Sequence, residues 1–130
     1  MTQTVRRYQD LAVWQIADEL RLEVYRLVAA GPAFDDWRFR DQIRNAAGSV
    51  AANIVEGYRR FSPKDFARFL QIAYASAGET QHWLEDGCAR GHWTESEIDA
   101  ARRLLRRLDP PLLALMRYLR TPAAQDRSKR

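Results

Sequence analysis

The sequence predicts an all-α fold, an up-and-down antiparallel four-helix bundle that forms a single domain over residues 1–130. Apolar residues recur at helical spacing in four long segments, and no segment shows the alternating pattern of a β-strand. Short turn signals separate the segments, and short links favour antiparallel packing of consecutive helices. A chain of 130 residues is long enough for one domain with a substantial core.

The first helix is expected over about residues 10–30, with Gly31-Pro32 as its stop signal. Its apolar stripe consists of Val13, Ile16, Ala17, Leu20, Val24, Leu27 and Val28. Further apolar residues lie on other sides of this helix: Leu11, Trp14, Leu22 and Tyr25. We therefore interpret Trp14 as a subunit-interface residue, because tryptophans in small bundles are mostly core or interface anchors. Base stacking is the alternative for the tryptophans, which are Trp14, Trp37, Trp83 and Trp93.

The second helix is expected over about residues 36–60, with Asp35 or Asp36 as its cap. It carries two neighbouring lines of residues at helical spacing. One line is apolar and contains Phe39, Ile43, Ala47, Val50, Ile54 and Phe61. The other is small or polar and contains Gln42, Ala46, Ser49, Asn53, Glu56 and Arg60. Small residues let another helix come close, and the polar residues must then find hydrogen-bond partners.

The third helix is expected over about residues 62–87 and has a specific start signal. Ser62 is the expected cap, Pro63 takes the first helical position, and Asp65 follows three residues after the cap. Phe66, Phe69, Leu70, Ala73, Ala77, Thr80 and Leu84 then recur at helical spacing.

The fourth helix is expected over about residues 94–120 and begins with a capping box of Thr94 and Glu97. Pro110-Pro111 lies inside it. A proline inside a helix costs about 3 kcal/mol and disfavours helix at the preceding residue. We therefore expect the fourth helix to be kinked or briefly broken at Pro110-Pro111. Residues 121–130 are expected to be a polar, frayed tail.

Three pieces of the chain resemble a known family: residues 10–20, 42–60 and 62–79, with a weaker match in the fourth helix. The matching positions are Gln42, Ser49, Asn53, Glu56, Gly57, Ser62, Phe66, Phe69, Ala73, Ser76 and Glu79. The chain resembles the four-helix-bundle proteins encoded in intervening sequences of bacterial 23S rRNA genes, also called S23-like. It departs from that pattern at Ala77, Gly78 and Pro110-Pro111, which concerns the fine packing of the last two helices.

The resemblance implies a cytosolic homopentamer with a central channel, a suspected link to RNA and no established catalytic activity. It also implies a relation to the basic accessory bundles that assist the reverse transcriptase of diversity-generating retroelements. The family has no catalytic residues to transfer to this sequence.

The sharpest candidate site joins the polar line of the second helix to polar residues of the third. Its members are Gln42, Ser49, Asn53, Glu56, Arg60, Ser76 and Glu79. A buried carboxylate needs hydrogen bonds or a partner charge, and Arg60 is placed for an i,i+4 pair with Glu56. We interpret the set as a polar network that fixes the register of the two helices or forms part of a subunit interface. The alternative is a ligand or catalytic site built from Glu56 and Glu79.

The net charge of +4 is concentrated in the C-terminal third of the chain. Residues 90–130 hold ten basic and five acidic residues, whereas residues 1–89 hold eleven and twelve. The candidate phosphate-binding residues are Arg102, Arg103, Arg106, Arg107, Arg117 and Arg120. Clustered cations suffice for contact with the phosphates of RNA or DNA, and a solvated helix face is the alternative interpretation.

Other site classes find little support in the sequence. It contains no glycine-rich phosphate loop, no nucleophile elbow and only two histidines, so we expect no enzyme. His82, Cys88 and His92 do not have the spacing of a zinc site, so we expect no metal or cofactor. No run reaches the roughly 18 apolar residues of a membrane helix, and no signal peptide is recognisable. A single cysteine forms no internal disulfide, so we expect a cytoplasmic protein.

Together these features predict a non-enzymatic, homo-oligomeric helical bundle, a pentamer by resemblance, that binds RNA or other nucleic acid through a basic C-terminal surface. The alternative is a protein-binding adaptor, such as an accessory subunit of a reverse transcriptase.

Overall fold

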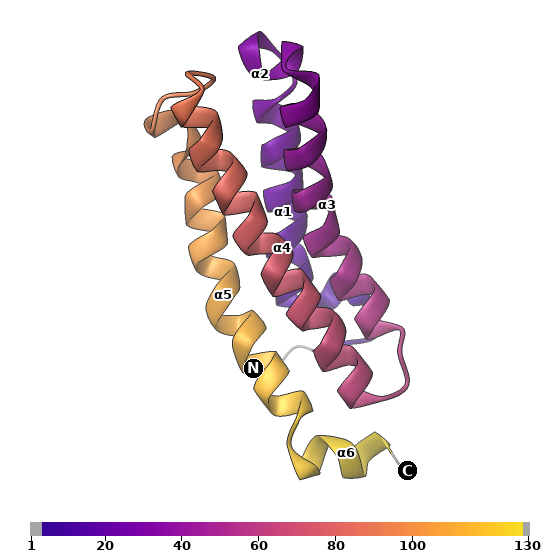
Figure 1. Ribbon diagram of the computed structural model, residues 1–130. Helices are drawn as coiled ribbons and strands as arrows, with labels where there is room; N and C mark the ends of the chain where they lie inside the picture. Colours follow the sequence, from indigo (N-terminus) through magenta and orange to yellow (C-terminus); the bar gives the residue numbers. More distant parts are fainter. Residues whose placement is uncertain (1–3, 129–130) are drawn as a thin grey trace.

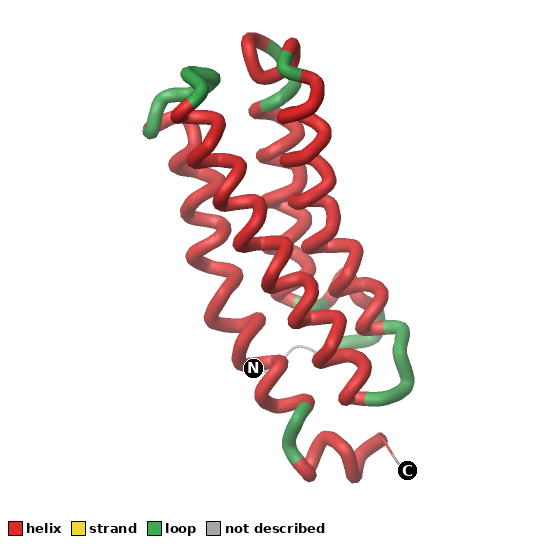
Figure 2. Tube along the Cα trace, viewed as in Figure 1, coloured by secondary structure: helices red, strands yellow, loops and turns green. Residues whose placement is uncertain are grey.

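The structure, a computed structural model, describes residues 4–128 of the chain. Within these residues it is helical and contains no strand. The helices are α1 (Ala12–Leu27), α2 (Gly31–Asp35), α3 (Trp37–Tyr58), α4 (Pro63–Ala89), α5 (Asp99–Leu119) and α6 (Pro122–Ser128). Short 3-10 turns precede α1 (Tyr8–Asp10) and α5 (Ser96–Ile98). The four long helices lie side by side with alternating directions, and α2 and α6 lie at opposite ends (Figure 1, Figure 2).

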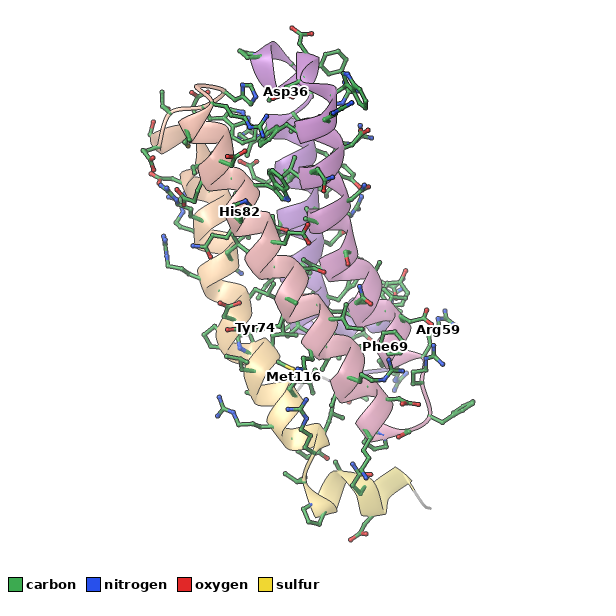
Figure 3. All side chains as sticks on the ribbon, in the orientation of Figure 1. Asp36, Arg59, Phe69, Tyr74, His82 and Met116 are labelled. Atoms are coloured by element: carbon green, nitrogen blue, oxygen red, sulfur yellow. The ribbon has the colours of Figure 1, made fainter. Side chains whose placement is uncertain are left out.

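The predicted four-helix bundle is confirmed by the way the long helices pack. Each long helix packs mainly against two others: α1 against α3 and α5, and α4 against α3 and α5. The largest of these interfaces joins α3 and α4. Figure 3 labels the two ends of the bundle through Asp36 and Arg59, and we name them the Asp36 end and the Arg59 end.

The apolar stripes expected from the sequence form the core. The largest fully buried side chains are Phe39, Leu20, Ile43, Ile54, Leu70, Leu84, Ile98, Leu108, Leu112, Val24, Val50 and Thr80. Phe61 differs from the expectation, because its side chain is 100% exposed. The helix α3 ends at Tyr58, so the helical spacing that placed Phe61 on the apolar line stops before it.

The capping hydrogen bonds expected at Ser62 and Thr94 are both present, and those at Thr94 precede the 3-10 turn Ser96–Ile98 that leads into α5. The backbone N–H of Asp65 donates to Ser62 Oγ at 3.4 Å. The capping box is complete, since the Thr94 N–H donates to Glu97 Oε1 at 3.0 Å and the Glu97 N–H donates to Thr94 Oγ1 at 3.3 Å. Asp36 precedes α3 but makes no side-chain capping bond.

The helix α5 runs without a break from Asp99 to Leu119, through both prolines. The expected short break is therefore wrong, and a kink stays a prediction. A proline cannot donate to the carbonyl four residues earlier, so the carbonyls of Arg106 and Arg107 lose their helical partners. Both arginines are exposed, which leaves these carbonyls on the side where water can reach them. Leu108 and Leu112 are fully buried on either side of the prolines and hold the helix against the core.

The segment expected to be a frayed tail contains the helix α6. Thr121 caps it, because its Oγ1 accepts the Ala124 N–H at 3.3 Å. Ala124 is buried, and Gln125 Nε2 donates to the Leu119 carbonyl at 3.1 Å. The helix α6 turns across the Arg59 end of the bundle (Figure 1). Residues 129–130 of the expected tail lie outside the described residues.

Two glycines permit close contacts that a larger residue would prevent. A Cβ atom on Gly57 would lie 2.8 Å from Phe66 Cδ1 and 2.9 Å from Phe69 Cβ. A Cβ atom on Gly87 would lie 2.6 Å from Trp93 Cε3 and 2.9 Å from Phe39 Cζ. Trp93 follows the end of α4, is buried, and donates its indole N–H to the Leu27 carbonyl at 3.2 Å. Gly87 therefore leaves the space in which Trp93 anchors the α4–α5 connection.

We predict that Gly87→Ala lowers the free energy of unfolding by about 1–3 kcal/mol, because the new methyl group overpacks the Trp93 contact. Gly78→Ala is the matched control in the same helix, since a Cβ atom on Gly78 would meet no other atom within 4 Å. Alanine has a higher helix propensity than glycine, so Gly78→Ala should raise stability by up to about 1 kcal/mol. Urea unfolding at one protein concentration measures both changes. Equal effects of the two substitutions would contradict the close packing at Gly87.

Candidate functional site

A polar cluster joins α3 to α4 halfway along the bundle. Ser49 Oγ and Ser76 Oγ share a hydrogen bond of 2.8 Å between the two helices. Asn53 Nδ2 donates to Ser49 Oγ at 2.9 Å and to the Ser49 carbonyl at 2.8 Å. Thr80, which is fully buried, donates to the Ser76 carbonyl at 2.8 Å. The structure thus brings together the hydroxyl and amide members of the expected network and adds Thr80, which the sequence analysis had placed only among apolar positions.

The charged members of the expected network lie elsewhere. Glu56 is 55% exposed and pairs with Arg60 at 2.8 Å on the surface of α3. Glu79 is exposed and accepts the Trp83 indole N–H at 3.4 Å. The expected pair of Glu56 with Arg60 is therefore present, but it lies at the surface of α3 and not in the α3–α4 cluster, because the polar side of α3 is wide enough to turn Glu56 to solvent. Glu56 and Glu79 have different hydrogen-bond partners, Arg60 and Trp83, and none in common within the described residues. The structure therefore does not join them into the alternative ligand site.

Two further members of the predicted set stand apart from the cluster. Gln42 is exposed near the start of α3. Trp14 is half-buried at the start of α1, where its ring packs edge-on against Tyr8 with centroids 5.2 Å apart.

The predicted arginines divide into three groups around α5. At 100° per residue, Arg103 points directly away from the buried stripe of the helix, and Arg106 and Arg117 lie beside it, between Arg103 and the α4 side. All three are exposed, and none has an ion pair or side-chain hydrogen bond within residues 4–126. Arg107 turns toward α1 and lies 3.7 Å from Glu19, with both side chains mostly exposed. An exposed pair at this distance contributes little stability and leaves the guanidinium accessible. We call Arg103, Arg106, Arg107 and Arg117 the basic face.

Arg102 and Arg120 lie on the α4 side of the helix and are engaged within the chain. Arg102 contacts three carboxylates, those of Glu85 at 2.7 Å, Asp99 at 3.8 Å and Glu95. Its side chain is only 21% exposed. Arg120 Nη2 donates to Gln71 Oε1 at 3.1 Å. Arg102 therefore closes the α4–α5 connection, and of the six predicted arginines it is the least available to a phosphate.

A groove between α4 and α5 lies beside the basic face. Its lining residues are Tyr74, Ala75, Ala77, Gly78, Gln81, Leu105 and Asp109, and it encloses about 230 Å³. Burial raises the pKa of the Asp109 carboxyl. Tyr74, at the mouth of this groove, is labelled in Figure 3.

The Asp36 end holds a charged cluster that the sequence analysis missed. His92 Nε2 lies 2.9 Å from Asp36 Oδ2, and Arg90 Nη1 donates to the same oxygen at 3.0 Å. The His92 ring packs edge-on against Phe39, with centroids 5.0 Å apart. Asp36 is far in sequence from Arg90 and His92, and only the antiparallel packing of α3 and α4 brings them together.

His92, Cys88 and His82 do not form a metal site. No group of three or more His, Cys, Asp or Glu side chains in the described residues is placed to hold a metal ion. Cys88 is half-buried, and desolvation raises the pKa of its thiol, which makes it a poor nucleophile. None of the helices within residues 4–128 is long and apolar enough to cross a membrane.

We predict that Asn53→Ala lowers the free energy of unfolding by about 1 kcal/mol, because it removes the hydrogen bonds to Ser49. Glu56→Ala, three residues along the same helix, is the matched control and should cost less than about 0.5 kcal/mol, since it removes an exposed pair. Thermal or urea unfolding measures the two values. If Glu56→Ala lowered the free energy of unfolding more than Asn53→Ala, the Glu56 carboxylate and not the Asn53 amide would be the more stabilising group.

We also predict an acid-dependent contribution from Asp36. Its hydrogen bond with His92, and secondarily the one from Arg90, lowers the pKa of the Asp36 carboxyl below its ordinary value of 3.8. A lowered pKa in the folded state stabilises the fold above the ordinary pKa, and this contribution is lost as the pH falls through the lowered pKa. The melting temperature of Asp36→Asn should therefore lie below that of the unsubstituted protein at pH 6, and the gap should close below about pH 4. Asp41→Asn, an exposed carboxylate of the same helix, is the control and should show no such gap.

Comparison with solved structures supports the fold. The chain is similar to a crystal structure, at 1.70 Å resolution, of a protein with unknown function from the S23 ribosomal protein family of Bacteroides thetaiotaomicron VPI-5482. The two share 22% sequence identity with a TM-score of 0.66, and the match covers 85% of this chain and 100% of the other. No curated protein matches the sequence.

Comparison with protein families agrees with the resemblance carried by the polar line of α3. The model of the 23S rRNA-intervening sequence protein family matches residues 9–112, which include all four long helices except the end of α5. On this match, the chain belongs to the family of 23S rRNA-intervening sequence proteins.

Proposed function

We propose that this protein is a non-enzymatic, homo-oligomeric helical bundle that binds RNA through the basic face of α5. The observation that supports the proposal is the availability of its arginines. Arg103, Arg106 and Arg117 are exposed and have no carboxylate partner in the described residues. Guanidinium groups that are already paired, like that of Arg102, lose an existing partner on binding a phosphate, whereas unpaired ones do not.

The basic face also has a suitable length. Arg103 and Arg117 are fourteen positions apart, which corresponds to about 21 Å along a helix. Double-stranded DNA presents one phosphate per strand about every 3.4 Å along its axis, and at that spacing the face spans about six phosphates of one strand. Repetition of the face in an oligomer would raise the affinity further through multivalency.

The oligomer, its location and its biological setting are parts of the same proposal. The pentamer follows from the family resemblance, and several large apolar side chains on the surface are available for subunit contacts, among them Leu22, Ile72 and Tyr74. A cytoplasmic location agrees with the single, half-buried cysteine. A relation to the accessory bundles of diversity-generating retroelements would place the RNA contact beside a reverse transcriptase.

We predict that the triple substitution of Arg103, Arg106 and Arg117 by glutamine weakens RNA binding and flattens its salt dependence. Each lost phosphate contact should reduce the magnitude of the slope of log K against log salt by about 0.7–0.9, so the three together should reduce it by about 2.1–2.7. Fluorescence anisotropy with a labelled structured RNA across a salt series measures both quantities.

The control is a triple substitution of Arg26, Arg38 and Arg44 by glutamine, which changes the net charge equally but lies on α1 and α3, outside the basic face of α5. It should leave the slope nearly unchanged. Equal losses in both variants would show that only net charge matters, and unchanged binding in the first variant would contradict the proposal.

The second candidate function is a protein-binding adaptor in which the same arginines contact an acidic partner. The exposed apolar residues Ile72 and Tyr74 on α4 favour it, because protein interfaces combine apolar cores with arginine-rich rims. Absence of RNA binding at low salt, together with retention of a reverse transcriptase on the immobilised protein, would favour the adaptor.

A further inference from the structure

The Arg59 end of the bundle contains a pocket that is separate from the basic face. The N-terminal segment folds back there against the end of α3 and the α3–α4 turn. The lining residues are Arg6, Arg7, Tyr8, Gln9, Tyr58, Arg59 and Phe61, and the pocket encloses about 620 Å³. This volume is within the range of small-ligand sites. Arg59, at the rim, is labelled in Figure 3.

The charge of the pocket lining is entirely positive. Three of the seven lining residues are arginines, and none is acidic. Arg6 and Arg59 have no ion pair within residues 4–126, and the Arg7 side chain is 70% exposed, with its Nε 3.6 Å from Asp10. Asp10 is itself engaged by the backbone N–H groups of Arg6 and Arg7, at 3.0 and 3.3 Å. Asp10 thus fixes the N-terminal segment in place while the guanidinium groups stay available to an anion.

The aromatic residues of the pocket are of two kinds. Tyr8 and Tyr58 each pack against a second aromatic ring. Tyr8 packs edge-on against Trp14, and Tyr58 packs edge-on against Phe66 with centroids 6.3 Å apart. Phe61 is uncovered, with its side chain 100% exposed in the α3–α4 turn. A fully exposed phenyl ring gains from being covered by another apolar surface.

Arginines and an uncovered aromatic ring in one pocket match the chemistry of an unpaired nucleotide. Guanidinium groups bind the phosphate, and the flat face of a base stacks on an aromatic ring regardless of which base it is. Base faces are available in single strands and are hidden by stacking in a duplex. We propose that this pocket binds unpaired nucleotides of single-stranded RNA, with Arg6, Arg7 and Arg59 on the phosphates and Phe61 stacked on a base.

This inference rests on the proposed function and extends it. The basic face runs along α5 from Arg103, near the Asp36 end, to Arg117, and α5 ends at the Arg59 end of the bundle, where the pocket lies (Figure 1). The basic face would hold the phosphates of paired or unpaired RNA, whereas the pocket would select for unpaired nucleotides.

The test compares two labelled RNAs on the full-length protein: an unstructured ten-nucleotide single strand and a blunt duplex of two annealed strands, which has no unpaired nucleotide. Phe61→Ala should weaken binding of the single strand at least about five-fold, which is the lower limit for loss of one base–aromatic stack. The same variant should bind the blunt duplex with unchanged affinity. Phe61→Trp retains an aromatic ring and should restore single-strand binding. Because Phe61 is fully exposed, neither substitution removes a core contact.

Phe34→Ala is the matched control, since Phe34 is another exposed phenylalanine but lies in α2 at the Asp36 end. It should change neither affinity. Arg59→Gln should weaken single-strand binding and lower its salt slope by about 0.7, the value for one phosphate contact on a single strand. A single-stranded DNA of the same length and the free mononucleotide AMP complete the set of probes.

The outcomes separate this inference from the proposed function. If the duplex binds and Phe61→Ala leaves binding of the single strand unaffected, the pocket assignment is overturned and the basic face stands. If the unsubstituted protein binds neither RNA at low salt, both are overturned. A smaller oligomer in Phe61→Ala, detected by light scattering, would assign Phe61 to a subunit contact instead and also overturn the inference. Binding of AMP alone, without gain from a longer strand, would overturn it in favour of a mononucleotide site.

Discussion

The close approach of α3 and α4 is the constraint on which the rest of the bundle depends. These two helices share the largest interface, and they can do so because small residues face each other along it. Ser49 on α3 meets Ser76 on α4, and Gly57, near the end of α3, lets Phe66 and Phe69 of α4 come close. At so short a separation a serine on one helix reaches a serine on the other, so polar residues can be satisfied inside the interface without a long side chain. The same separation fixes the register of the pair, because a shift of one turn would break the Ser49–Ser76 hydrogen bond.

The fixed register determines what is placed at the two ends. At one end it brings Gly87 beneath Trp93 and aligns Asp36 with Arg90 and His92. At the other end it brings Gly57 against Phe66 and Phe69, so the α3–α4 turn is short and leaves Phe61 outside the core. The two ends differ chemically as a result. One is closed by a buried indole and paired charges, and the other presents unpaired arginines and an uncovered ring.

Much of the fold could be predicted from the sequence because its signals are local. The apolar periodicity of the four long helices and the caps at Ser62 and Thr94 involve residues within one or two turns of each other. The errors concern features that depend on which side of a helix faces water. The prolines of α5 do not break it, because the carbonyls they leave unpaired lie on its exposed side. Glu56 was placed in the polar network with Ser49 and Asn53, but it pairs with Arg60 at the surface, because the polar line of α3 is broad and its Ser49–Asn53 part is the one that faces α4.

The same limit applies to the candidate sites. The sequence identifies α5 as rich in arginine, but the partners of Arg102 come from α4, from the α4–α5 connection and from α5 itself. Pairs such as Asp36 and His92, which are 56 residues apart in the sequence, have no local signal that could reveal them. The pocket at the Arg59 end likewise combines two distant segments, and Phe61 looked like a core residue in the sequence because the end of α3 could not be placed to within three positions.

The tryptophans are distributed unevenly between the two ends of the bundle, so the two ends contribute unequally to its fluorescence. Trp83 and Trp93 pack around Phe39 near the Asp36 end, with ring centroids 6.0 and 5.5 Å from it, and Trp37 begins α3 at that same end. Trp14 alone lies toward the Arg59 end, against Tyr8. Intrinsic tryptophan emission is therefore dominated by one end of the molecule, whereas events at the other end alter the emission of a single indole.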